Sequence, residues 1–174
     1  MATDSIQSRL VFNALVHQYL IPGAQIGAKI SVDKKTRQIS EVFAATRLVL
    51  PSPTYGCLDC HGFIPPARLQ QEALTPAERH AQRYVDDGSV PEPSVITLNA
   101  LSAAQAANDL MMLFTGLYDD SLDLPYLMTF ARERAVSPIL PHPEVACPDC
   151  SLHPKSRRAR GDRARLPCRP QKAS

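Results

Sequence analysis

Two pairs of cysteines constrain the fold more than any other feature of the sequence. Cys57 and Cys60 lie in GCLDCHGF, Cys147 and Cys150 lie in CPDC, and residues 61–146 separate the pairs. Four thiolates are the ligand set of a closed tetrahedral structural zinc site. The sequence therefore predicts one zinc held by these four cysteines. Such a site would join two distant segments of the chain and stabilise the fold by closing a long loop.

Two other interpretations of the cysteines stay open at this point. A redox disulfide requires a thioredoxin-like βαβ context and a depressed pKa, whereas Cys57 follows a predicted hairpin and the Pro-rich PSPTYG. Coincidence is the other alternative. A disulfide framework is disfavoured because the start of the chain has no signal-peptide pattern and the cytosol keeps thiols reduced. The fifth cysteine, Cys168, is expected to be a free thiol.

Length and charge predict one domain and a tail. The 174 residues suffice for one ordinary domain, here residues 1–152, followed by a basic, disordered tail over 153–174. The tail has few apolar residues and no aromatic side chain on which a base could stack, so no nucleic-acid partner is expected. No apolar run is long enough to span a membrane, and we expect a cytoplasmic protein without a membrane partner. The cations of the tail, opposed only by Asp162, are Lys155, Arg157, Arg158, Arg160, Arg163, Arg165, Arg169 and Lys172.

Hydrophobic spacing and turn residues predict the secondary structure. A helix begins at Asp4 or Ser5, either of which can cap it, and ends at Pro22 and Gly23. Two β-rich runs flank KKTR and predict a hairpin, and YLMTFARERAVSPIL predicts a second, shorter one. Short helices are expected in PPARLQQEAL and TPAERHAQRYVDD. The apolar segment VITLNALSAAQAANDLMMLFTGL predicts a long helix buried by its neighbours and closed by a glycine.

The order of these signals resembles the C-terminal half of the ThiF/MoeB/HesA family, the bacterial relatives of ubiquitin-activating enzymes. The matching pieces are TDSIQSRLVFN, YLIPGAQIGAKISVD, GCLDCHGFI, QRYV, PSVITLNALSAAQAANDLMMLFTGL and CPDC, and they span roughly residues 3–150. Members of that family are Rossmann-like proteins that use ATP to adenylate the C-terminal glycine of a ubiquitin-like or sulfur-carrier protein. The resemblance implies an α/β fold: the C-terminal half of a Rossmann-like ThiF-type adenylating domain, in which hairpins and helices complete a mostly parallel sheet stapled by zinc.

The resemblance also implies roles for individual residues. Asp4 matches the family aspartate that helps to hold magnesium and the ATP phosphates, and Arg9 and Asn13 match the rest of that motif. Asp4 is thus the candidate catalytic and cofactor-binding residue, although helix capping alone would also explain it. The family's zinc ligands match the same four cysteines.

Several parts of the family's machinery are missing from this sequence. The Gly-rich phosphate loop, the acidic residue for the ribose and the basic residues for the phosphates lie upstream of the T-D motif, which only Met1 and Ala2 precede here. No G-x-G-x-x-G pattern occurs, so no helix N-terminus is built to cradle a pyrophosphate. Residues 61–146 contain no cysteine for thioester or sulfur transfer, and His80 on a polar helix face is expected to be merely solvated.

These observations together predict a partial adenylating domain that needs a partner. We expect ATP-dependent activation of a ubiquitin-like or sulfur-carrier protein when a nucleotide-binding half, or a homodimer partner, is supplied, with structural Zn²⁺ and Mg-ATP as cofactors. Two rivals stay open: a non-catalytic zinc-stapled module that binds a carrier protein, and a truncated remnant of the family without function.

Overall fold

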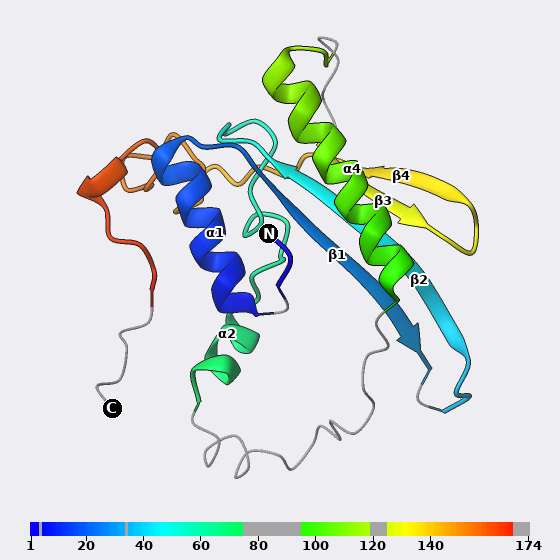
Figure 1. The fold of residues 1–174 in the computed structure, drawn as a ribbon. Coiled ribbons are helices and arrows are strands. Elements are labelled where there is room, and N and C mark those ends of the chain that lie inside the picture. Colours follow the sequence, from blue (N-terminus) through cyan, green and yellow to red (C-terminus); the bar gives the residue numbers. More distant parts are fainter. Residues whose placement is uncertain (4, 34, 75–94, 119–124, 169–174) are drawn as a thin grey trace, which may run out of the picture. The chain divides into compact units, whose positions relative to one another are not determined.

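A computed structural model describes residues 1–3, 5–33, 35–74, 95–118 and 125–168, and Figure 1 draws their helices and strands. The chain divides into two compact units. We call the first the sheet unit; it comprises Met1–Ala2, Ala24–Leu48 and Leu74–Leu140. We call the second the cysteine unit; it comprises Thr3–Gly23, Val49–Ala73 and Pro141–Ser174. The predicted division at residue 152 differs from this one, because the segments around both cysteine pairs belong with the N-terminal helix.

The sheet unit contains four strands in the order β1-β2-β3-β4. The strands are β1 (Gly23–Val32), β2 (Ile39–Val49), β3 (Tyr126–Phe130) and β4 (Ala135–Ile139). Asp33 shapes the turn after β1, because its carboxylate accepts the backbone N–H groups of Lys35 (2.9 Å) and Thr36 (2.7 Å). Both predicted hairpins are therefore confirmed.

The described sheet is antiparallel. Phe43 of β2 faces Phe130 of β3, and Tyr126 of β3 faces Ile139 of β4. The expected mostly parallel sheet is not found among the described strands. The reason is that the connections within the two hairpins are only a few residues long, and a parallel pair needs a crossover of about a dozen residues or more. The structure is thus mixed α and β with a four-stranded antiparallel sheet.

Helix α4 (Ile96–Thr115) packs on this sheet through one narrow stripe. Its buried residues, Leu98, Ser102, Ala106 and Asp109, recur every three or four positions. The Ser102 hydroxyl donates to the carbonyl oxygen of Gly27 (3.1 Å), and the Ser102 carbonyl accepts the Thr46 hydroxyl (3.2 Å). The predicted glycine stop is confirmed, since Gly116 caps the helix in the left-handed conformation with φ of 68°.

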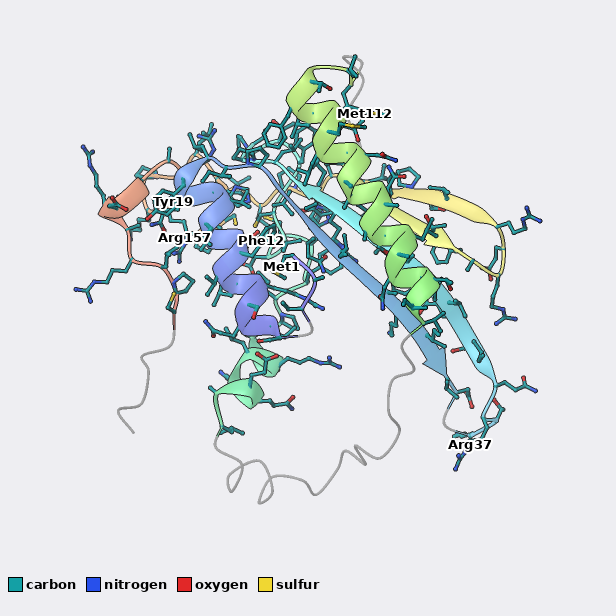
Figure 2. The ribbon with its side chains drawn as sticks, viewed as in Figure 1. Met1, Phe12, Tyr19, Arg37, Met112 and Arg157 are labelled. Carbon is teal, nitrogen blue, oxygen red and sulfur yellow. The ribbon has the colours of Figure 1, made fainter. Side chains whose placement is uncertain are left out.

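The rest of the α4 surface is more exposed than the sequence predicts. Ile96 is 82% exposed and Phe114 is 71% exposed, and Leu101 and Met111 are also exposed. Met112, which is labelled in Figure 2, is exposed as well. The expectation of a helix buried by its neighbours is therefore wrong for the described residues. The physical reason is geometric. One face of a sheet covers only one stripe of a helix, whereas the apolar residues of α4 occupy most of its circumference.

The cysteine unit begins with helix α1 (Ile6–Tyr19), as predicted. Ser5 caps it, since the Ser5 hydroxyl accepts the N–H of Ser8 (3.3 Å). The chain then turns at Gly23, where a Cβ atom would lie 2.9 Å from the Phe12 ring of α1. A larger residue at this position would require the Phe12 ring to move.

Helix α2 (Pro66–Ala73), also predicted, is attached to the start of α1 by one carboxylate. Glu72 of α2 accepts the backbone N–H groups of Ile6 (2.7 Å) and Gln7 (3.0 Å) and the hydroxyl of Ser5 (3.0 Å). These groups are orphan donors at a helix N-terminus, where negative charge is favourable. Since α2 buries none of its own residues, Glu72 is its principal attachment. The second short helix expected, TPAERHAQRYVDD, lies outside the described residues.

The segment 153–168 has defined contacts with α1 and differs from the disordered tail that composition suggested. The N–H of Ala159 donates to the carbonyl of His17 (2.9 Å), and the Gln18 amide donates to the carbonyl of Gly161 (2.7 Å). Three arginines of the segment bind backbone carbonyl oxygens. They are Arg157 (to Arg165, 3.1 Å), Arg158 (to Pro51, 3.3 Å) and Arg160 (to Ser156, 2.6 Å). Residues 169–174 lie outside the described residues.

None of the helices in the described ranges combines the length and the hydropathy that a membrane crossing requires.

Candidate metal centre

The first cysteine pair lies in a tight turn closed by backbone hydrogen bonds. The N–H of His61 donates to the carbonyl of Cys57 (3.1 Å), and the N–H of Gly62 donates to that of Asp59 (2.8 Å). Gly56, just before the pair, has φ of +77°, and a Cβ atom there would lie 2.6 Å from the carbonyl oxygen of His142. A glycine is therefore required where this turn meets the segment that leads to the second pair.

The second cysteine pair forms a similar turn. The Ser151 hydroxyl donates to the carbonyl of Cys147 (2.6 Å), and the N–H of Asp149 donates to the Cys147 sulfur (3.4 Å). The latter is the kind of N–H···S contact expected at a metal-binding turn. It also spreads the charge of a thiolate onto the backbone.

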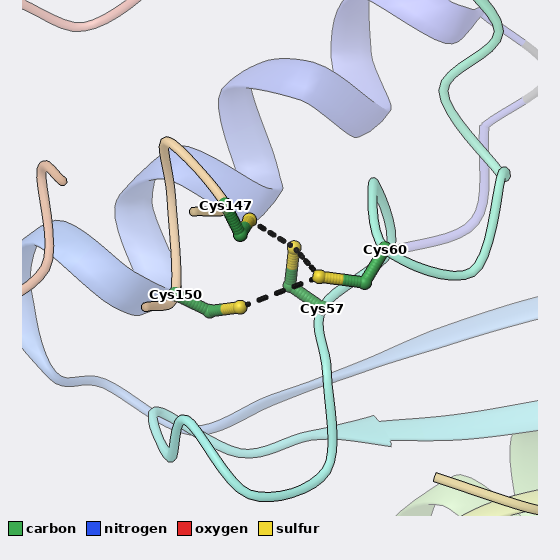
Figure 3. Close-up of side chains that lie close together, drawn as sticks. All are labelled: Cys57, Cys60, Cys147 and Cys150. Atoms are coloured by element: carbon green, nitrogen blue, oxygen red, sulfur yellow. Dashed lines mark hydrogen bonds between the residues drawn. The ribbon is translucent and has the colours of Figure 1, made fainter. Parts of the chain in front are cut away.

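The two turns bring all four sulfurs to one point (Figure 3). The Sγ atoms are 3.7 Å apart for Cys57 and Cys60, 3.5 Å for Cys57 and Cys147, and 3.5 Å for Cys60 and Cys150. All four lie within 4.8 Å of one another. A regular tetrahedron with Zn–S bonds of about 2.3 Å has edges of about 3.8 Å. The sulfurs could therefore hold a metal ion such as zinc with little movement.

Burial and protonation fit this interpretation. The four cysteines are free thiols, and each is at most 5% exposed. Hydrogen bonds to Cys147 raise the pKa of Cys57 and Cys150 and lower the pKa of Cys60, while the bond to Cys150 lowers the pKa of Cys147. A thiol must lose its proton to act as a metal ligand. Metal binding would replace these protons and make affinity depend on pH.

Helix α1 connects the two turns through Asn13, which is fully buried. Its amide oxygen accepts the N–H of Leu58 in the first turn (3.0 Å), and its amide nitrogen donates to Asp149 in the second (2.6 Å). The other carboxylate oxygen of Asp149 pairs with Arg157 at 2.5 Å. One side chain therefore fixes the relative position of both cysteine pairs.

His17 lies one helical turn after Asn13 and is also fully buried. Neither of its ring nitrogens has a hydrogen-bond partner among the described residues. Burial lowers the pKa of His17 to about 4, although Asp149 and Cys60 act in the opposite direction. The imidazole is therefore neutral.

The structure thus brings together the four cysteines that the sequence assigns to zinc. Cys168 is exposed and is not part of the cluster. Asp4 and His80, the other residues considered for chemistry, lie outside the described residues, and Arg9 makes a 3.5 Å contact with the carbonyl of Phe63.

Sequence reasoning did not predict the bridging role of Asn13, or the positions of His17 and Asp149. The available signal was an Asn and a His four positions apart in a helix whose other buried positions are largely apolar.

Comparison of the sequence with models of known protein families, and with curated proteins, gave no match.

Proposed function

We propose that the cysteine unit is a structural zinc centre. The observation that carries this proposal is the convergence of four buried thiols at tetrahedral spacing. A closed set of four thiolates leaves no open coordination position, which is typical of structural and not of catalytic zinc. The ion would tie the segment before α2 to the segment after Pro141. The joined turns would also hold α1 by way of Asn13.

For the whole chain, we propose a part in the ATP-dependent activation of a ubiquitin-like or sulfur-carrier protein. The support is the resemblance of six ordered sequence pieces to the ThiF/MoeB/HesA family, together with the cysteine cluster that this resemblance implies. The sequence contains no phosphate-binding loop, and the described sheet is antiparallel. Adenylation therefore requires a nucleotide-binding half or a second protein that carries one.

A non-catalytic module that binds a carrier protein is the second candidate. The exposed apolar residues of α4 favour it, because exposed apolar side chains gathered on one element of a folded unit are candidates for a contact site. Such a module would bind the carrier without any need for ATP.

One experiment separates the two functions. The zinc-loaded chain is titrated calorimetrically with Mg-ATP, and then with a peptide that ends in a free Gly-Gly carboxylate; the amidated peptide is the control. The adenylation proposal predicts no ATP binding by this chain alone, and formation of a peptide adenylate, detected by mass spectrometry, once a nucleotide-binding half is added. Specific peptide binding that never leads to adenylate would favour the module. Micromolar ATP binding by the chain alone would contradict the requirement for a second half.

A further inference from the structure

Helix α4 has a second apolar stripe, outside the stripe that packs on the sheet. We call it the outer seam; it consists of Ile96, Ala100, Ala103, Ala107, Leu110 and Phe114. Ile96 and Phe114 project far into solvent, the three alanines are exposed, and Leu110 is partly exposed. Along the helix these positions alternate by four and three residues, which is the heptad spacing of a helix that pairs with another helix. The outer seam therefore has the pattern of a contact with a second helix.

The outer seam carries no charge. In α4, all of whose residues are described, Asp109 is the single charged residue, and it is 5% exposed and accepts hydrogen bonds from Gln105 and Tyr118. A partner that is recognised by its charge would find no opposite charge on this seam. A helix that lies on a membrane surface typically has lysine or arginine on its polar face, and α4 has neither. The partner that fits is apolar and uncharged along the contact, as the outer seam itself is.

The outer seam is also symmetric about the middle of α4. Its six positions form three pairs, each equally distant from Gln105, namely Ile96 with Phe114, Ala100 with Leu110, and Ala103 with Ala107. Two antiparallel copies of the helix would bring together the members of each pair, and would do so twice, because a two-fold contact is reciprocal. Alanine would then face alanine near the centre, where the backbones can approach closely, and a pair of large apolar residues would close each end.

A parallel pair of the same helices fits less well. It would place Phe114 against Phe114 and Leu110 against Leu110 at one end, while alanine faced alanine over most of the remaining length. The bulky end would then hold the alanines apart. Antiparallel helices also bring the positive end of one macrodipole beside the negative end of the other. The size pattern and the dipoles both favour the antiparallel arrangement.

We propose that the outer seam of α4 is a docking surface for a second copy of this chain, and that the two α4 helices pack antiparallel about a two-fold axis at the level of Gln105. Neither the zinc centre nor adenylation is required for this contact. A helix of 20 residues is about 30 Å long, so one helix pair buries less than the roughly 800 Å² per partner of a standard interface. The dimer is therefore weak, and the chain is a monomer at protein concentrations of about 1 μM or less.

Sedimentation equilibrium of the full chain measures this association directly. The zinc-loaded protein is kept under reducing conditions, so that the exposed Cys168 cannot link two chains, and its average mass is followed as the protein concentration is raised. We expect the mass to increase from that of one chain towards that of two. A mass of one chain at every concentration would overturn the proposal, whatever other protein the outer seam contacts.

Charged substitutions test whether the outer seam makes the contact. Ala103→Glu and Ala107→Lys change exposed positions, so both variants should fold, and circular dichroism and the thermal midpoint verify this. We expect each to weaken association by at least about tenfold, because the new charge would be buried without a partner. Asn108→Lys is the matched control, since Asn108 is exposed on α4 but lies outside the seam, and it should change association by less than about twofold.

A double variant tests the antiparallel register. Residue 103 of one copy faces residue 107 of the other in this register, so Ala103→Glu combined with Ala107→Lys should pair opposite charges and restore most of the association. Ala103→Glu combined with Ala107→Glu is its control and should stay monomeric. Wild-type association in either single variant would exclude the outer seam as the contact. A charge-paired double variant that associates no better than the single variants would exclude the antiparallel register.

Discussion

Replacing Asn13 by Ala should separate the two cysteine turns without touching a metal ligand. The substitution leaves the N–H of Leu58, a fully buried residue, without its 3.0 Å acceptor. That loss costs about 1–3 kcal/mol. It also removes the 2.6 Å charge-assisted bond to Asp149, which is worth about 1.5–3 kcal/mol, although Arg157 stays paired with the same carboxylate. We therefore expect the free energy of unfolding of the cysteine unit to fall by about 3–5 kcal/mol.

The assay is urea unfolding of the cobalt-substituted protein, followed by the thiolate-to-cobalt absorption band, because this signal reports the cysteine unit alone. Asn13→Asp is the informative companion variant. It preserves the acceptor for Leu58 but places a second carboxylate against Asp149, so it should not restore stability. Leu15→Ala, at a position 38% exposed on the same helix, should cost less than about 1 kcal/mol. An Asn13→Ala variant within about 0.5 kcal/mol of wild type would refute the bridging role.

Three further predictions follow from the geometry. Gly56→Ala should destabilise the cysteine unit by about 2 kcal/mol or more in the same urea assay. The reason is that residue 56 has φ of +77° and that the new methyl group would meet the carbonyl oxygen of His142. An unchanged urea midpoint would contradict this. Glu72→Ala should release α2, so that hydrogen exchange of the α2 amides accelerates while α4 amides exchange as before; equal α2 protection in both proteins would show that other contacts hold this helix. On α4, Phe114→Gln should change the free energy of unfolding by less than about 0.5 kcal/mol, whereas Ala106→Gln, at a position 7% exposed, should lower it by about 1–3 kcal/mol. Thermal unfolding measures both, and the reverse order would mean that the outer face of α4 is covered.

The elements predicted from the sequence are those with strong local signals. Helix α1 could be delimited because Ser5 can cap it and Pro22 and Gly23 stop it. The hairpins could be predicted because β-rich runs flank short polar turns. The cysteine centre could be predicted because two C-x2-C pairs have few other uses in one chain.

The features that were missed depend on contacts between distant segments. The basic composition of residues 153–168 suggests a solvated tail, but Arg158 binds the carbonyl of Pro51, and the backbone of Ala159 and Gly161 binds His17 and Gln18 of α1. Composition does not show which acceptors an arginine will reach. The expectation of a mostly parallel sheet came from resemblance and not from the hairpins themselves, whose short turns require antiparallel pairing.

The bridging role of Asn13 could not be predicted for a related reason. It requires residues 58 and 149 to lie on either side of the same helix position, and no local pattern in α1 reports this. The Rossmann-like assignment and the roles of Asp4 and Mg-ATP stay predictions.

The most direct test of the central claim is the metal content of the purified chain. Protein expressed with added zinc and passed through a desalting column is analysed by inductively coupled plasma mass spectrometry, beside the Cys57→Ser and Cys168→Ser variants. The four-cysteine centre predicts one zinc per chain in wild type and in Cys168→Ser, because Cys168 is exposed and outside the cluster, and a large loss in Cys57→Ser. Wild-type protein without bound metal, or Cys57→Ser with one zinc per chain, would contradict the account.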